Sequence, residues 1–402
     1  MRSPGFKIII FLLLLCHTTI KLNGQQLAAI QAVYAQNNLV TAKEAIDSYT
    51  IVHPQDIAGL LLKARIYNAI ATNAPLAELH ADSRTESFKS ILQAAAINSN
   101  GVKAQLEQDN FELLTTIYNG YTSDGIAVFN AAAEKGQQQE YENALLYFKK
   151  AAQVNNFLTA QGWGGTSPDA DNLYYSAISA MYAEHISEAY RFCKIIADYK
   201  LVFTIPDKDF EPAYQWLVFY LRQKKQAALL DAYTKLSDSL FPRAAYFILN
   251  YIDWQREQQD YTNLFTAYTK LLHRFPAQPQ YRLYYYHDIF QYVYSNAGTG
   301  ALADTLAVGL PALVLQYPND AGARLLLARY YMQQAASLQS IPGKKQAQKN
   351  YMQQAVTQLK YIVDRLPRAA KKQVDESATL LVYTLKLLNR KDEAAFYSKR
   401  LL

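Results

Sequence analysis

Small and hydrophobic residues recur along this chain with the spacing of one face of an α-helix. In the segment 140–156, Ala144, Phe148 and Ala151 stand at positions i, i+4 and i+7, which is the periodicity of an amphipathic helix. Glu140 and Glu142 stand near the start of this segment, and Lys149 and Lys150 stand nearer its end. Negative charge is favourable at the N-terminus of a helix and positive charge at its C-terminus, because of the helix dipole. The segment therefore predicts a helix with one buried face.

This ladder of residues recurs, and a helix breaker often follows its last member by five residues. A proline at that place ends a helix, because it cannot donate a backbone hydrogen bond and it restricts the residue before it. Four copies end in proline: Ala42, Ile46, Tyr49 and Pro54; Leu264, Tyr268, Leu271 and Pro276; Leu306, Leu310, Leu313 and Pro318; and Ala355, Leu359, Ile362 and Pro367. Two copies are weaker: Ala189, Cys193 and Ile196 lack the breaker, and Leu229, Tyr233, Leu236 and Pro242 fit with one residue inserted.

A second helix is expected before each ladder. Ala132 lies 12 residues before Ala144, and Ala177 lies 12 residues before Ala189. Small residues on two antiparallel helices let the helix axes approach closely. This pattern resembles the tetratricopeptide repeat (TPR), a helix-turn-helix unit of about 34 residues. The resemblance implies an all-α, right-handed superhelical solenoid of antiparallel helix pairs, similar to the exported repeat proteins of Bacteroidetes.

The composition also favours helices, because glycine (15) and proline (13) are scarce among the 402 residues and no strand or hairpin pattern stands out. We expect about eight or nine helix pairs over residues 25–402, read from the successive helical segments along the chain. The best-matching repeats lie at 125–200 and 245–276. The array is degenerate, since Val128 and Ala131-Ala132 replace the Trp and Leu-Gly that are typical of the family's first helix.

The N-terminus predicts export. Arg2 and Lys7 precede an apolar run at residues 8–15, an order typical of a secretory signal peptide. We expect a signal peptide at residues 1–24, cleaved near Gly24, and a periplasmic, envelope-associated or secreted product. Lipidation at Cys16 is the alternative, although Leu15 stands where such signals carry a small residue. No later stretch reaches the length of a transmembrane helix, about 18 uncharged apolar residues.

The charge of the mature chain identifies no partner. The first 24 residues carry three positive and no negative charges, so the formal charge falls from +6 to +3 on their removal. We therefore expect no nucleic-acid partner. The C-terminal part, residues 341–402, holds 13 Lys or Arg against 5 Asp or Glu. This basic part could meet an anionic envelope surface, or it could be a solvated helical face, since acidic residues interleave with its lysines.

The sequence contains no catalytic, cofactor-binding or metal-binding motif. None of the six histidines pairs with another at a helical spacing of four residues, and glycine loops that cradle phosphates are absent. Cys193 occupies a ladder position and should be buried. His287 and Asp288 are adjacent on a predicted helix and point about 100° apart, which argues against a catalytic dyad. We expect a non-enzymatic protein without cofactors.

The resemblance implies that the first helix of each pair lines a groove that binds a protein or peptide, so the chain should act as a scaffold. Mapping by repeat position gives the candidate groove residues Phe129, Tyr174, Met181, Tyr246, Asp253, Arg256 and Arg329. The alternative is a carbohydrate-related, outer-membrane-associated binding protein, in which surface tryptophans at 163, 216 and 254 stack on sugars. The 32 tyrosines suit either a recognition surface or the seams between helices.

Overall fold

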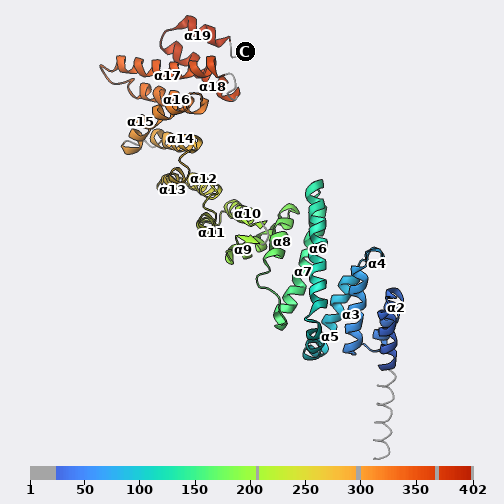
Figure 1. Ribbon diagram of the computed structural model, residues 1–402. Coiled ribbons are helices and arrows are strands. Elements are labelled where there is room, and N and C mark those ends of the chain that lie inside the picture. The colour runs from blue at the N-terminus through green and yellow to red at the C-terminus, as the bar shows by residue number, and fades with distance from the viewer. Residues whose placement is uncertain (1–23, 205–207, 296–299, 367–370, 400–402) are drawn as a thin grey trace, which may run out of the picture. The chain divides into compact units, whose positions relative to one another are not determined.

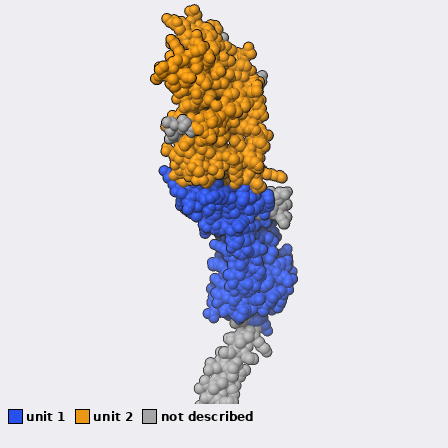
Figure 2. Space-filling model, turned by 90° about the vertical axis from the view of Figure 1, so that its left-hand side faces the viewer, with its two compact units in different colours: residues 1–241 blue, residues 242–402 orange. Residues whose placement is uncertain are grey.

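The computed structural model describes residues 24–204, 208–295, 300–366 and 371–399. The expected signal peptide, with Cys16, and the breaker Pro367 lie outside these ranges, apart from Gly24, which is helical. The chain divides into two compact units, residues 1–241 (unit 1) and 242–402 (unit 2), which Figure 2 shows in different colours.

Unit 1 consists of successive helices that pack in pairs along the chain (Figure 1). Short turns join the two helices of most pairs, so they run antiparallel. Within unit 1, the most extensive helix contacts join α6 to α7 and α3 to α5. After a helical segment at residues 24–35, the helices are α2 (Leu39–Val52), α3 (Ile57–Thr72), α4 (Ala74–Leu79), α5 (Ser83–Leu106), the 3-10 turn η1 (Glu107–Asp109), α6 (Glu112–Lys135), α7 (Gln138–Gln161), α8 (Ala170–Tyr182), α9 (Ile186–Asp198), α10 (Glu211–Gln223) and α11 (Ala227–Leu240).

Unit 2 continues the same plan, and each of its helices packs against the next (Figure 1). Its helices are α12 (Tyr246–Gln258), α13 (Tyr261–Arg274), α14 (Pro279–Ser295), α15 (Ala301–Gln316), α16 (Ala321–Ser337), α17 (Lys345–Arg365), α18 (Lys371–Leu387) and α19 (Lys391–Ser398). The protein is thus an all-α solenoid of stacked antiparallel helix pairs. The even-numbered helices α12, α14, α16 and α18 are the first helices of their pairs.

One feature of unit 1 had no signal in the sequence, a short antiparallel hairpin before α10. Its strands are β1 (Phe203–Thr204) and β2 (Lys208–Asp209), and Phe203 pairs with Asp209. The hairpin leads directly into Phe210, which is fully buried. Two residues per strand are too few to show the alternation by which strands are recognised in a sequence.

The buried face predicted from the ladder is confirmed. Ala144, Phe148 and Ala151 of α7 are fully buried, as is Ala132 on the facing helix α6. Gly125 of α6 gives Phe148 its place, because a Cβ atom there would lie 2.8 Å from Cε1 of the ring. The ladder residues of the other helices are also buried: Ala42, Ile46, Tyr49, Ala189, Cys193, Ile196, Leu264, Tyr268, Leu271, Leu306, Leu310, Leu313, Ala355, Leu359 and Ile362.

The register predicted for the ladder of α11 is wrong by one residue at its start. Leu229, expected to begin it, is 37% exposed, whereas Leu230, Thr234 and Ser237 are buried; Tyr233 of the expected ladder is buried as well. Leu230, Thr234 and Ser237 have the i, i+4 and i+7 spacing, and Pro242 follows Ser237 by five residues. The copy is therefore complete and contains no inserted residue. It was misregistered because two of its inward positions carry hydroxyl side chains.

Aspartates begin several of the helices. The side chains of Asp56, Asp169, Asp260 and Asp320 each accept a hydrogen bond from a backbone N–H in the first turn of the helix that follows. Such caps satisfy donors that have no partner within the helix. Asp169 accepts from the backbone N–H of Asn172 and so caps the start of α8.

Candidate functional site

Three cavities form a row along the first helices of unit 2. The first, of about 680 Å³, lies among α12, α13 and α14. The second, of about 260 Å³, lies among α14, α16 and α18 and shares Tyr284 and His287 with the first. The third, of about 740 Å³, lies mainly among α16, α17 and α18 and shares Arg329 with the second. We call this row the unit 2 groove.

A buried carboxylate organises the first cavity. Asp288 of α14 accepts hydrogen bonds from Arg256 of α12, at 3.1 Å from Nε and 2.8 Å from Nη2. The hydroxyl of Tyr268, on α13, donates to the same carboxylate at 2.7 Å. Arg256 also donates through Nη1 to Asp253 at 2.6 Å. One carboxylate thus links three helices and fixes the guanidinium of Arg256.

The electrostatics of this network follow from burial and pairing. Burial by itself raises the pKa of Asp288, but His287, Arg256 and Tyr268 outweigh it, so the pKa lies below its ordinary value. For Tyr268, burial and the nearby carboxylate of Asp288 both raise the pKa of the phenol. Asp288 is therefore ionised and Tyr268 neutral at physiological pH.

His287 does not form a hydrogen-bonded dyad with Asp288. Its Nδ1 atom lies 3.7 Å from Oδ1 of Asp288, which is longer than a hydrogen bond, and its side chain is half-exposed. The carboxylate is instead engaged by Arg256 and Tyr268. The arrangement is an ion-pair network that holds a groove-lining cation in place.

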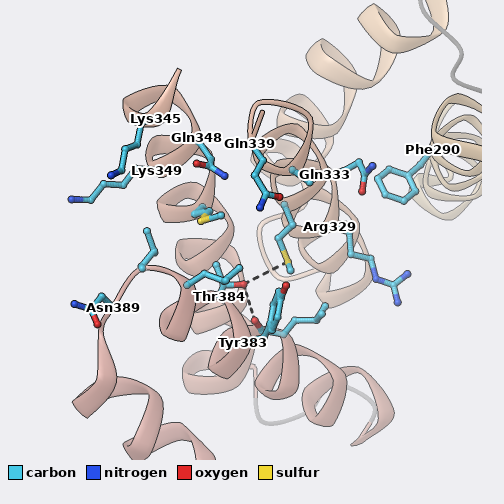
Figure 3. Close-up of a pocket in the computed structure, with 16 residues that line it drawn as sticks. Phe290, Arg329, Gln333, Gln339, Lys345, Gln348, Lys349, Tyr383, Thr384 and Asn389 are labelled. Atoms are coloured by element: carbon cyan, nitrogen blue, oxygen red, sulfur yellow. Dashed lines mark hydrogen bonds between the residues drawn. The ribbon is translucent and has the colours of Figure 1, made fainter. Parts of the chain in front are cut away.

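The third cavity combines an apolar floor with amides and lysines (Figure 3). Met332 and Leu380 contribute to the floor, and the half-exposed Tyr383 stands at its edge. Figure 3 shows Lys345 and Lys349 projecting side by side from α17. Four amide side chains also line the cavity: Gln333, Gln339, Gln348 and Asn389.

The charge of the third cavity is one-sided. Its lining includes Arg329, Lys345 and Lys349 and, among the residues that the structure describes, no carboxylate. Arg329 is paired with Glu376 of α18. Neither lysine forms an ion pair within the described part of the chain. The two ammonium groups are therefore available to an anionic group of a ligand.

The candidate residues from the sequence separate into two groups. Asp253 and Arg256 line the first cavity, and Arg329 lines the second and third. Tyr246 begins α12 and packs edge-on against Phe247 at 5.5 Å between ring centroids, without lining a described cavity of unit 2.

The unit 1 candidates lie in seams between helices. Phe129 meets the rings of Tyr141 and Tyr175 at 5.6 and 5.3 Å, and Tyr174 meets Phe210 at 5.6 Å. The sulfur of Met181 lies 3.9 Å from that of Cys193. Each of Phe129, Tyr174 and Met181 is half-buried. A role for these three residues in binding stays a prediction.

Sequence reasoning missed the most strongly charged part of the groove. Lys345 and Lys349 belong to the second helix of their pair, whereas the mapping considered first helices alone. Their spacing of four residues places both on one helical face, and this signal could have found them. Tyr383 was missed because α18 (Lys371–Leu387) lies outside the best-matching repeats, 125–200 and 245–276, where repeat positions can be assigned.

The tryptophans give little support to the carbohydrate alternative. Trp163 and Trp254 are 6% and 8% exposed, so their faces are not open to a sugar ring. Trp163 packs against Phe111 and Phe157 at 5.8 and 5.3 Å in the core of unit 1. Trp216 is half-buried and stacks on Tyr220 at 5.2 Å.

Three further observations concern chemistry and membranes. Cys193 is buried, and burial raises the pKa of its thiol, so it behaves as a small apolar core residue. Within the described ranges, no three His, Cys, Asp or Glu residues are grouped so that they could hold a metal ion. No helix in the described part of the chain combines the length and apolar character needed to cross a bilayer.

Comparison with known proteins yields only distant structural likenesses. No family model and no curated protein matches the chain. It is similar to PilW, a widely conserved type IV pilus biogenesis factor, at 14% identity and a TM-score of 0.29, covering 64% of this chain and 95% of that one. It is also similar to the human IFIT1 dimer with m7Gppp-AAAA, at 11% identity and a TM-score of 0.34, covering 83% of this chain and 67% of that one. The likeness to the TPR domain of P58(IPK) has 12% identity and a TM-score of 0.25, and it covers 92% of this chain and 98% of that one. TM-scores this low carry no argument, so the fold assignment rests on the helix packing described above.

Proposed function

We propose that this chain is a non-enzymatic scaffold of the cell envelope that binds a protein or peptide segment in the unit 2 groove. The observation that carries the proposal is the row of three cavities along α12, α14, α16 and α18, joined by shared lining residues. An elongated groove of this kind suits a chain segment, because successive side chains of the segment enter successive cavities.

The lining of the third cavity indicates the chemistry of the segment. Apolar side chains such as Met332 and Leu380 favour apolar side chains of the partner. The surrounding amides can donate to and accept from a peptide backbone. Lys345 and Lys349 favour an acidic side chain, since a charge-assisted hydrogen bond is stronger than a neutral one. The preferred partner is a segment with alternating apolar and acidic residues.

The envelope location rests on the N-terminal pattern, in which Arg2 and Lys7 precede the apolar run at residues 8–15. It is tested by cell fractionation and by sequencing the N-terminus of the mature protein. A new N-terminus near residue 25 in an envelope or secreted fraction supports export. An uncleaved chain in the cytosol contradicts the location and leaves the binding proposal standing.

Binding is tested by placing a photo-activated cross-linker at Tyr383 in intact cells, with charge-reversed variants. Lys345→Glu combined with Lys349→Glu should reduce the cross-linked partner about tenfold or more, because it turns attraction into repulsion. The matched control is Lys386→Glu with Lys391→Glu, two exposed lysines outside the groove lining. Equal recovery of the partner with both double variants, or no partner with the wild type, would contradict the proposal.

A further inference from the structure

Unit 1 contains a separate cavity, of about 550 Å³, among α3, α4, α5, α6 and α7. Its volume lies within the range of small-molecule sites, about 300 to 1,000 Å³. Tyr121 of α6, which is buried, forms part of its floor together with Arg84 and Thr85 of α5 and Lys150 of α7. None of the sequence candidates lines this cavity, and the groove proposed above does not include it.

The floor places two cations over one aromatic ring. Cζ of Arg84 lies 5.5 Å and Nζ of Lys150 lies 5.6 Å from the centre of the Tyr121 ring. The hydroxyl of Thr85 lies 3.0 Å from that of Tyr121 and accepts a hydrogen bond from Lys150 at 3.2 Å. The ring and the hydroxyl therefore fix both cations.

The ammonium group of Lys150 has N–H donors without a partner among the described residues. Arg84 is paired with Asp124, but Lys150 forms no ion pair within the described residues and donates there to Thr85 alone. An ammonium group carries three donors, so two remain for a ligand. A half-buried ammonium that lacks a carboxylate partner is a strong anchor for an anionic group, because burial weakens screening by solvent.

Gly120 makes the position of Arg84 possible. A Cβ atom at this residue would lie 2.4 Å from both Cζ and Nε of Arg84. Glycine inside a helix is destabilising relative to alanine, and α6 nonetheless has glycine here. The absence of a side chain lets the guanidinium lie against α6, beside the Tyr121 ring.

The rim of the cavity has the opposite charge. Glu78 and Asp82 are exposed, and Glu140 and Asp124 are half-buried at its edge. Four carboxylates against two cations give the lining a formal charge of −2 with histidine neutral. A multiply charged anion is repelled by this rim. A ligand with one carboxylate and one ammonium group satisfies both the cationic floor and the acidic rim.

We propose that this cavity binds a short peptide with free ends. Its C-terminal carboxylate pairs with Lys150 and Arg84 on the floor, and its N-terminal ammonium faces the carboxylates of the rim. Its side chains contact the apolar wall formed by Val128 and Leu146. This site lies within unit 1, so it can succeed or fail independently of binding in the unit 2 groove.

The test uses the full-length protein and a mixture of random tripeptides, observed by saturation-transfer NMR. Free-ended tripeptides should bind saturably, and amidation of their C-termini should weaken binding about tenfold, the usual effect of losing a charged hydrogen bond. Inorganic phosphate should not compete, because the rim repels it. Absence of saturable binding, equal binding of amidated peptides, or competition by phosphate overturns the proposal.

Two variants localise the binding. Lys150→Met should weaken tripeptide binding about tenfold, whereas Lys149→Met, whose lysine pairs with Glu188 outside the cavity, should not change it. Gly120→Ala should weaken binding with little change in thermal stability, because the methyl group displaces the end of Arg84 from Asp124 while alanine stabilises α6 relative to glycine. Wild-type affinity in both Lys150→Met and Gly120→Ala overturns the assignment.

Discussion

At the scale of single residues, Asp288 is the side chain on which the first cavity of the groove depends. Replacing it by asparagine removes the charge that engages Arg256 and Tyr268 while keeping the shape. We expect Asp288→Asn to lower the free energy of unfolding by about 2 kcal/mol, less than for a fully buried pair because Arg256 is partly exposed. Urea denaturation followed by circular dichroism measures the change.

The matched control is Asp253→Asn, which alters the other carboxylate that contacts Arg256. That pair is half-exposed on both sides and joins residues three apart on one helix. Such a pair contributes less than about 1 kcal/mol. Equal losses in the two variants would show that burial of Asp288 adds nothing to the network.

The same network predicts a dependence of stability on pH. The pKa of Asp288 is lower in the folded state than its ordinary value of 3.8, so the ionised carboxylate stabilises the fold above pH 3.8. This contribution is lost as the pH falls through the lowered pKa of the folded state. The difference in unfolding free energy between wild type and Asp288→Asn should therefore be constant near neutral pH and shrink below pH 3.8. A difference that stays constant in acid would contradict this assignment.

At the scale of secondary-structure elements, close approach of the two helices in a pair depends on small residues. Ala132 of α6 is fully buried against α7, whereas its neighbour Ala133 is exposed. Ala132→Leu should destabilise the fold by about 1 to 3 kcal/mol, because the larger side chain has no space between the helices. Ala133→Leu should change stability by less than about 0.5 kcal/mol. Thermal and urea unfolding of the two variants compares them directly.

The core of these elements could be predicted from the sequence because helical periodicity is a local signal. Ala144, Phe148 and Ala151 are recognisable within one helix, without knowledge of what covers them. The ladder of α11 was misregistered because hydrophobicity does not mark Thr234 and Ser237 as buried. The other copies of the ladder can correct the register of such a helix. Pro242 follows Ser237 by five residues, as the breaker does in those copies.

The candidate groove could be predicted only in part. Asp253, Arg256 and Arg329 were found because repeat position indicates which helix lines the groove. The partnership of Arg256 with Asp288 joins residues 32 positions apart, and no spacing rule within a helix reveals it. The cavity of unit 1 was invisible for the same reason, since Arg84 and Lys150 come from different helices and meet only in the folded chain.

At the scale of the whole molecule, a stacked array predicts that a substitution acts mainly on nearby helices. In such arrays each repeat contacts chiefly its neighbours, so stability is approximately a sum of local terms. Asp288 lies in unit 2 and Ala132 in unit 1, and the residues that contact the first do not contact the second. Hydrogen exchange should therefore accelerate in α12–α15 of Asp288→Asn and in α6–α7 of Ala132→Leu, each without effect on the other set.

The double variant Asp288→Asn with Ala132→Leu makes this prediction quantitative. Distant sites without shared partners combine additively to within about 0.5 kcal/mol. The summed loss in the two sets of helices should therefore equal the losses of the single variants, as measured by exchange in each set. If the chain instead unfolds as one cooperative body, each single variant should accelerate exchange equally in both sets of helices, while the two losses still add. Exchange that accelerates only in the set of helices carrying the substitution would mean that the unit with the groove and the unit with the unit 1 cavity can be destabilised separately.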